Sequence, residues 1–109
     1  MIQEPDRRTA KRLPTNIPVD YLADHFMGNG TMLNVSPDGM EIVGNYEVTV
    51  GLNMSLRIFL PERTRPLYVR VAVVRWVHGK DFGVELLVLP PSAQSGLTMF
   101  VASLLPDHG

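Results

Sequence analysis

The sequence predicts a mainly β fold: a small antiparallel β-barrel of six or seven strands with one C-terminal α-helix. Two observations lead to this prediction. Between residues 17 and 89, apolar and polar residues alternate with a period of two in short runs, and turn-forming residues separate the runs. After residue 89 the period changes to that of an amphipathic helix. Several short strands followed by one helix are typical of a barrel with a helix packed on it.

The first half of the chain contains three predicted strands, and a turn follows each of the first two. The strands lie at residues 17–24, 31–36 and 39–44. The sequence MGNG at 27–30 has the composition of a turn. In Ser36-Pro37-Asp38-Gly39, serine suits the first position of a β-turn, proline fixes φ at the second, and glycine is favoured at the fourth.

The second half continues the strand pattern. Predicted strands lie at residues 47–51, 54–60, 67–78 and 82–89. The polar segment 61–66, which begins and ends with proline, is predicted to be a loop. The alternation falters at Val74, Arg75 and Trp76, which indicates a β-bulge there.

A C-terminal helix is predicted over residues 92–105. Its apolar stripe has helical spacing and consists of Leu97, Phe100, Val101, Leu104 and Leu105. Ser92 suits the N-cap position, and Pro106 ends the helix. Gly96 weakens the helix by about 1 kcal/mol relative to alanine. We expect the stripe to pack on the barrel, and the alternative is pairing with a second copy of the chain.

A basic segment precedes the barrel. Residues 1–12 are polar and show no useful period, so we expect a flexible arm ahead of a single domain over residues 13–109. The arm contains Arg7, Arg8, Lys11 and Arg12, four of the ten lysines and arginines. Such a cluster is either a solvated tail or an anion site, because arginine offers a planar fork of donors to phosphate.

Composition disfavours several functional classes. A net charge of −1 argues against a surface that binds nucleic acid as a whole. The chain has no cysteine, and its three histidines are dispersed, so no metal-ligand spacing is seen. We expect neither an enzyme nor a bound cofactor. Without an apolar run of membrane-spanning length or a secretory leader, we expect no membrane insertion and a cytoplasmic location.

Two short motifs stand in a recognisable order. Arg8 and Arg12 form Arg-x-x-x-Arg in the arm, and Asn34, Ser36 and Gly39 form Asn-x-Ser-x-x-Gly at a strand-turn-strand junction. Two residues apart on a strand, Asn34 and Ser36 share one face. Together with VVRWV, GVELLVL and the terminal helix, these motifs make the sequence resemble the PilZ domain over residues 6–105.

The resemblance implies a function, since PilZ domains are bacterial receptors for the second messenger cyclic di-GMP. It implies that Arg8 and Arg12 contact the phosphates and the guanine faces. It also implies that Asn34 and Ser36 bind a guanine edge and that Gly39 allows the turn that presents them. The arm would then wrap the ligand against the barrel and signal to an effector protein.

Two positions depart from the commonest family pattern. Position 34 is more often Asp, which has two acceptor oxygens where Asn34 has one, so we expect Asn34→Asp to retain or strengthen binding. Arg7 adds an arginine before the motif, which in this family is associated with capture of two stacked ligand molecules. The stoichiometry, one ligand or two, therefore stays open.

Other functions fit the sequence less well. A PilZ-like adaptor that binds only proteins is the first alternative, although such members usually lack the arginines. A barrel for single-stranded nucleic acid would need aromatic side chains interleaved with cations. Trp76 is expected to pack in the core or against the helix. The oligomeric state stays open between a monomer and a weak dimer.

Overall fold

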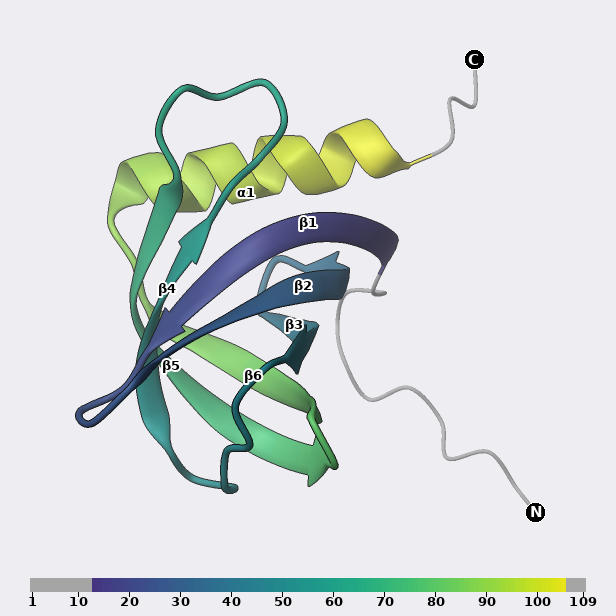
Figure 1. Ribbon diagram of the computed structural model, residues 1–109. Coiled ribbons are helices and arrows are strands. Elements are labelled where there is room, and N and C mark those ends of the chain that lie inside the picture. Colours follow the sequence, from purple (N-terminus) through teal and green to yellow (C-terminus); the bar gives the residue numbers. More distant parts are fainter. Residues whose placement is uncertain (1–12, 106–109) are drawn as a thin grey trace.

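In the computed structural model, which describes residues 13–105, six strands form a closed antiparallel barrel and one helix lies across one end of it (Figure 1). The elements are β1 (Leu13–Leu22), β2 (Met27–Ser36), β3 (Gly39–Gly44), β4 (Asn53–Ile58), β5 (Leu67–His78), β6 (Asp81–Val88) and α1 (Pro91–Leu104). The strand order is β1-β2-β3-β6-β5-β4, and β4 pairs back onto β1 to close the barrel. The predicted fold class is therefore confirmed.

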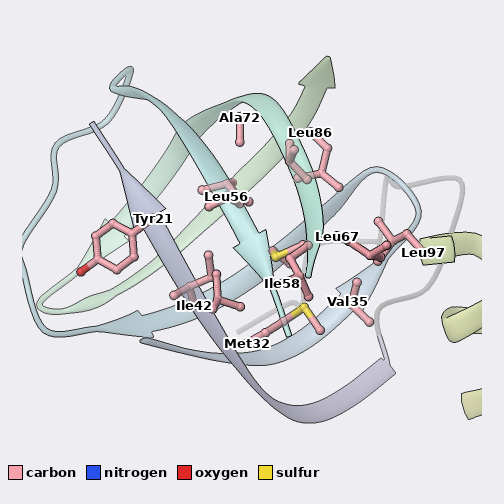
Figure 2. Close-up of a cluster of buried hydrophobic side chains, with 14 of the residues drawn as sticks. Tyr21, Met32, Val35, Ile42, Leu56, Ile58, Leu67, Ala72, Leu86 and Leu97 are labelled. Atoms are coloured by element: carbon pink, nitrogen blue, oxygen red, sulfur yellow. The ribbon is translucent and has the colours of Figure 1, made fainter. Parts of the chain in front are cut away.

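The inward face of each strand fills the barrel. In β1, Ile17, Val19 and Tyr21 are buried as their alternation predicts. Figure 2 shows Tyr21 at one end of the core, and Val35 and Leu97 near the opposite end, where the helix enters. Full burial of a large apolar side chain contributes about 1.5–3 kcal/mol, so this interior is the main source of stability.

The helix was predicted over residues 92–105, and it spans Pro91–Leu104, so each end lies one residue earlier than predicted. The predicted N-cap at Ser92 is wrong, because Pro90 occupies that position and no side chain makes a capping hydrogen bond. Pro91 lies in the first turn, where its missing N–H is harmless. The stripe is buried at Leu97 and Val101, but Leu105 is exposed. A Cβ added at Gly96 would lie 2.9 Å from Leu67 Cδ2, so glycine allows the helix to approach β5 closely.

The turn predicted at residues 27–30 is wrong, because β2 already begins at Met27. The chain reverses earlier, where the Ala23 N–H donates to the Phe26 carbonyl at 3.0 Å. Gly28 is in the strand for a packing reason: a Cβ there would lie 2.3 Å from Cζ of Tyr21. The glycine accommodates the Tyr21 ring and does not form a turn.

The strand predicted at residues 47–51 is also wrong. This segment is a loop, in which the Leu52 N–H donates to the Thr49 carbonyl at 3.1 Å and Gly51 has a φ of 92°. The Tyr21 hydroxyl holds the start of the loop, because it donates to the Tyr46 carbonyl at 2.9 Å and accepts from the Tyr46 N–H at 2.8 Å. Burial raises the pKa of the Tyr21 phenol above its ordinary value of 10.0.

Strand β5 carries two irregularities. The predicted bulge between Val74 and Trp76 is confirmed by the pairing with β6. A second irregularity is in the pairing with β4, where Met54 pairs with Ala72 and Leu56 with Val69, so β5 has one extra residue and Ala72 is buried on the inward face. After the bulge, both Arg75 and Trp76 are exposed, which brings an aromatic ring and a cation to the outer surface of the barrel.

Candidate functional site

The strand register aligns four residues in a row on the outer face of the barrel. Asn34 of β2 pairs with Glu41 of β3, Glu41 pairs with Gly83 of β6, and Gly83 pairs with Trp76 of β5. Their neighbours Val35, Met40 and Phe82 are buried in the core, so the row faces outward. These four positions are called the Asn34–Trp76 row below.

The turn after Asn34 is the two-residue turn that the sequence predicts. Ser36 pairs with Gly39, and Pro37 and Asp38 lie between them. The Ser36 hydroxyl is buried and donates to Asp38 Oδ1 at 2.7 Å. The Leu86 N–H donates to the Asp38 carbonyl at 3.0 Å and so anchors the turn to β6. For Ser36 to donate to a ligand, its hydroxyl must leave Asp38.

Gly39 is placed in the site for a reason other than its conformational freedom. Within residues 13–105, φ is positive only at Gly51 and Gly79, so the backbone at Gly39 does not require glycine. Gly39 pairs with Ser36 on one side and with Glu85 on the other. Gly39 is itself buried, so the outer face is already covered at this point.

Asn34 is half-buried, and its two amide atoms lie in different surroundings. Its Nδ2 donates to Glu41 Oε1 across the β2–β3 pair. Its Oδ1 is buried and has no hydrogen-bond partner among the described residues. A buried acceptor without a partner costs about 1–3 kcal/mol, so a ligand that brings a donor to this oxygen would relieve that cost.

Trp76 lies on the outer face, and the expectation that it packs in the core or against the helix is wrong. Its side chain is 37% exposed, and a Cβ added at Gly83 would lie 2.0 Å from its Nε1. The indole therefore lies over Gly83, next to Glu41 in the row. The sequence carries a signal for this placement, because the bulge at residues 74–76 reverses the parity of β5.

An ion pair lies beside the row. Arg75 contacts Glu85 Oε1 through Nε at 2.8 Å and through Nη2 at 2.7 Å. Both side chains are about half exposed, so the pair contributes at most about 1 kcal/mol to stability. Glu41, Arg75 and Glu85 were missed from the sequence because cross-strand neighbours are set by register, which a single sequence does not reveal.

Arg7, Arg8 and Arg12 of the arm lie outside the described residues. The point where the arm joins the barrel is described, however. β1 begins at Leu13, which pairs with Val35, and Pro14 pairs with Asn34. The arginine segment is therefore attached to the barrel directly beside the Asn34–Ser36 segment.

Residues 13–105 do not bring together three His, Cys, Asp or Glu side chains that could hold a metal ion. That part of the chain also contains no helix with the length and apolar character needed to cross a membrane. The functional groups gathered on this face are an amide, a hydroxyl, carboxylates, a guanidinium and an indole. They are suited to recognising a polar aromatic ligand.

Comparison with known proteins identifies one family and several solved structures with a similar fold. The family model of the PilZ domain matches residues 6–103. No curated protein matches the chain. Among solved structures, the inhibitor of motility MotI/DgrA from Bacillus subtilis is 21% identical, with a TM-score of 0.76 over 93% of this chain and 52% of that chain. This chain therefore spans about half the length of that protein.

Two further solved structures are PilZ domains. One is the PilZ domain of CeSA from a cellulose-synthesizing bacterium, at 14% identity and a TM-score of 0.68, over 86% of this chain and 97% of that chain. The other is the PilZ domain of YcgR from Escherichia coli with c-di-GMP, at 13% identity and a TM-score of 0.68, over 91% and 92% of the two chains. At these identities, the likeness shows the shared fold.

Proposed function

Because the chain belongs to the PilZ domain family, we propose that it is a receptor for cyclic di-GMP. One observation carries the proposal above others: the Arg-x-x-x-Arg segment joins the barrel at Leu13, whose partner Val35 lies between Asn34 and Ser36. The arginine segment is therefore covalently joined to the barrel next to the strand that carries Asn34 and Ser36. The PilZ domain of YcgR, solved with this ligand, supports the same assignment.

The chemistry of the ligand matches the groups available. Cyclic di-GMP has two phosphates and two guanine bases. Arg8 and Arg12 can donate in pairs to phosphate and can also stack on a guanine face. Asn34 Oδ1 is an acceptor without a partner among the described residues, and the guanine edge carries N–H donors. Ser36 contributes a hydroxyl that is released from Asp38 on binding.

The covalent connection supports convergence of these groups. Consecutive Cα atoms are about 3.8 Å apart, so Arg12 is held within one residue of the β1–β2 pairing. Arg8 is five residues from Leu13 and has a longer reach. A ligand placed beside Asn34 is therefore accessible to both guanidinium groups.

The output passes through an effector protein in this proposal. Ligand binding fixes the arginine arm against the Asn34–Ser36 side of the barrel and creates a surface that the free protein lacks. The effector recognises that surface. The proposal places the protein in the cytoplasm, where the nucleotide is made and read.

An adaptor without nucleotide binding is the second candidate. The observation that favours it is that both motif side chains already have partners within the chain, Asn34 in Glu41 and Ser36 in Asp38. In that case, the side chains of Asn34 and Ser36 would stabilise the hairpin and would not bind a ligand. The two functions differ in one measurable property, affinity for cyclic di-GMP.

Calorimetric titration of the full chain with cyclic di-GMP tests the proposal. We expect a dissociation constant in the micromolar range or tighter, about −8 kcal/mol or more favourable, and far weaker binding of GMP and GTP. The mononucleotides serve as matched controls, because each carries one guanine but lacks the cyclic phosphate pair. Absence of heat and of competition at ~100 µM cyclic di-GMP, about −5.5 kcal/mol, supports the adaptor instead.

A further inference from the structure

We propose that Glu41 is a positioning residue for Asn34: its carboxylate fixes the Asn34 amide so that Oδ1 is presented to the guanine, and it makes asparagine the residue that fits position 34. The inference rests on the proposed function for its ligand. The coupling between residues 34 and 41 does not depend on that function.

The coupling begins with the backbone of β2. Met32 pairs with Ile42 and Asn34 pairs with Glu41, so Leu33 is an extra residue that forms a bulge. The bulge lets β2 place the apolar Met32 inward and, two residues later, turn Asn34 outward beside Glu41. Directly opposed residues on one face of an antiparallel pair have side chains in contact range.

The chemistry of the two side chains sets the orientation of the amide. An ionised carboxylate only accepts hydrogen bonds, so the Asn34 atom that faces Glu41 must be the Nδ2 donor. Oδ1 then points away from Glu41, where it is buried without a partner among the described residues. Glu41 thus converts an amide that can rotate into an acceptor of fixed direction.

A fixed acceptor selects the base it meets. The guanine edge presents the N1–H and N2 amino donors side by side, whereas adenine has an acceptor at N1. Asn34 Oδ1 can therefore accept from two adjacent guanine donors, whereas on adenine it meets one amino donor beside the N1 acceptor, so it favours guanine. An amide released from Glu41 can rotate and offer Nδ2 instead, which removes this part of the discrimination.

The same pair explains why asparagine occupies position 34. An aspartate there would face the Glu41 carboxylate at hydrogen-bonding distance, and two like charges so close oppose ionisation of both. On this proposal, Asn34→Asp should weaken binding, which differs from the expectation drawn from the sequence. Substituting Glu41→Gln as well restores a donor–acceptor pair, with Gln as the donor and Asp as the acceptor.

A four-member cycle in the full chain tests the coupling: wild type, N34D, E41Q and N34D/E41Q. We expect N34D alone to lower the thermal midpoint of the free protein and to weaken cyclic di-GMP binding by roughly tenfold. N34D/E41Q should regain the wild-type midpoint and an affinity within about threefold of wild type. The matched control is N34D/E85Q, which removes a carboxylate from the neighbouring strand but not from the position opposite residue 34.

Nucleotide discrimination gives a readout that a purely structural role does not change. Glu41→Ala should reduce the preference for cyclic di-GMP over cyclic di-AMP by about tenfold, because the amide is free to rotate. N34D/E41Q should keep the preference, because a carboxylate at position 34 still only accepts. An unchanged preference in Glu41→Ala overturns the positioning role.

The cycle also separates this inference from the proposed function. If the wild type does not bind cyclic di-GMP, the proposed function fails. The thermal midpoints still test the coupling of residues 34 and 41, because rescue of the N34D midpoint by E41Q supports it. If N34D is as stable as the wild type and binds as tightly, or if E85Q rescues it equally well, Glu41 does not constrain position 34 and the inference is overturned.

Discussion

At the scale of single residues, the positions that the sequence left unexplained are those whose partners lie across strands. Gly28 and Gly44 are required because the Tyr21 ring occupies the space where their Cβ atoms would lie. Gly83 accommodates Trp76 in the same way. Composition marks such glycines as turn residues, and only the register shows that an aromatic ring covers them. This is why the turn at 27–30 was predicted wrongly.

Tyr21→Phe should destabilise the protein without altering ligand binding. The substitution keeps the ring but leaves the Tyr46 carbonyl and N–H without their hydrogen bonds to the hydroxyl, which costs about 1–3 kcal/mol. Urea denaturation measures this loss. The matched control is Tyr68→Phe, whose side chain is 46% exposed and should change stability by less than about 0.5 kcal/mol. Equal stability of the two variants would contradict the role assigned to the Tyr21 hydroxyl.

At the scale of elements, periodicity predicted the barrel strands and the helix, because burial of one face dictates the period of each. It failed at residues 47–51, where Val48 is buried but Val50 is exposed in a loop held by Tyr46. The bulge in β5 between Val74 and Trp76 interrupts the apolar–polar alternation, and the sequence showed this interruption. The bulge in β2 left a weaker signal: Met32 and Asn34 share a parity, yet one is apolar and the other polar.

Leu97→Ala should detach the helix from the end of the barrel. Leu97 is 2% exposed and belongs to the same core as the barrel strands, so truncation should lower the free energy of unfolding by about 2–5 kcal/mol. Chemical denaturation followed by circular dichroism measures it. Met99→Ala on the same helix is the control, because Met99 is 72% exposed and its loss should be near neutral. A near-neutral Leu97→Ala would show that the helix is not part of the core.

In the whole molecule, the strand register brings two hairpins together at the candidate site. One is the β2–β3 hairpin, which carries Asn34 and Glu41, and the other is the β5–β6 hairpin, which carries Trp76 and Gly83. The Asn34, Ser36 and Gly39 positions were predicted from the motif, and the structure gathers them on one hairpin. Their ligand roles, and those of Arg7, Arg8 and Arg12, stay predictions. Glu41 lies two residues after Gly39 and Trp76 lies far along the chain, and both entered the site only through the strand register, which the sequence does not reveal.

Arg7 should set the ligand count. A stacked pair of cyclic di-GMP molecules crowds four phosphates together, and a third guanidinium beside Arg8 and Arg12 offsets their repulsion. Arg7→Leu should therefore lower the calorimetric stoichiometry from two ligands to one while the protein stays folded. A wild-type stoichiometry of one removes this role and leaves Arg7 as a solvated charge.

If the arginine arm and the Asn34–Ser36 hairpin together bind cyclic di-GMP, the double variant Arg8→Ala, Arg12→Ala should lose binding. Each guanidinium should contribute about 1.5–3 kcal/mol through charge-assisted hydrogen bonds, so the pair should be required for measurable binding. The measurement is the thermal midpoint of wild type and variant with and without cyclic di-GMP, alongside calorimetry. We predict equal midpoints for the two free proteins and a ligand-induced rise only in the wild type, because a ligand stabilises only the protein that binds it. Near wild-type affinity in the double variant would show that the arginine arm is not required for binding.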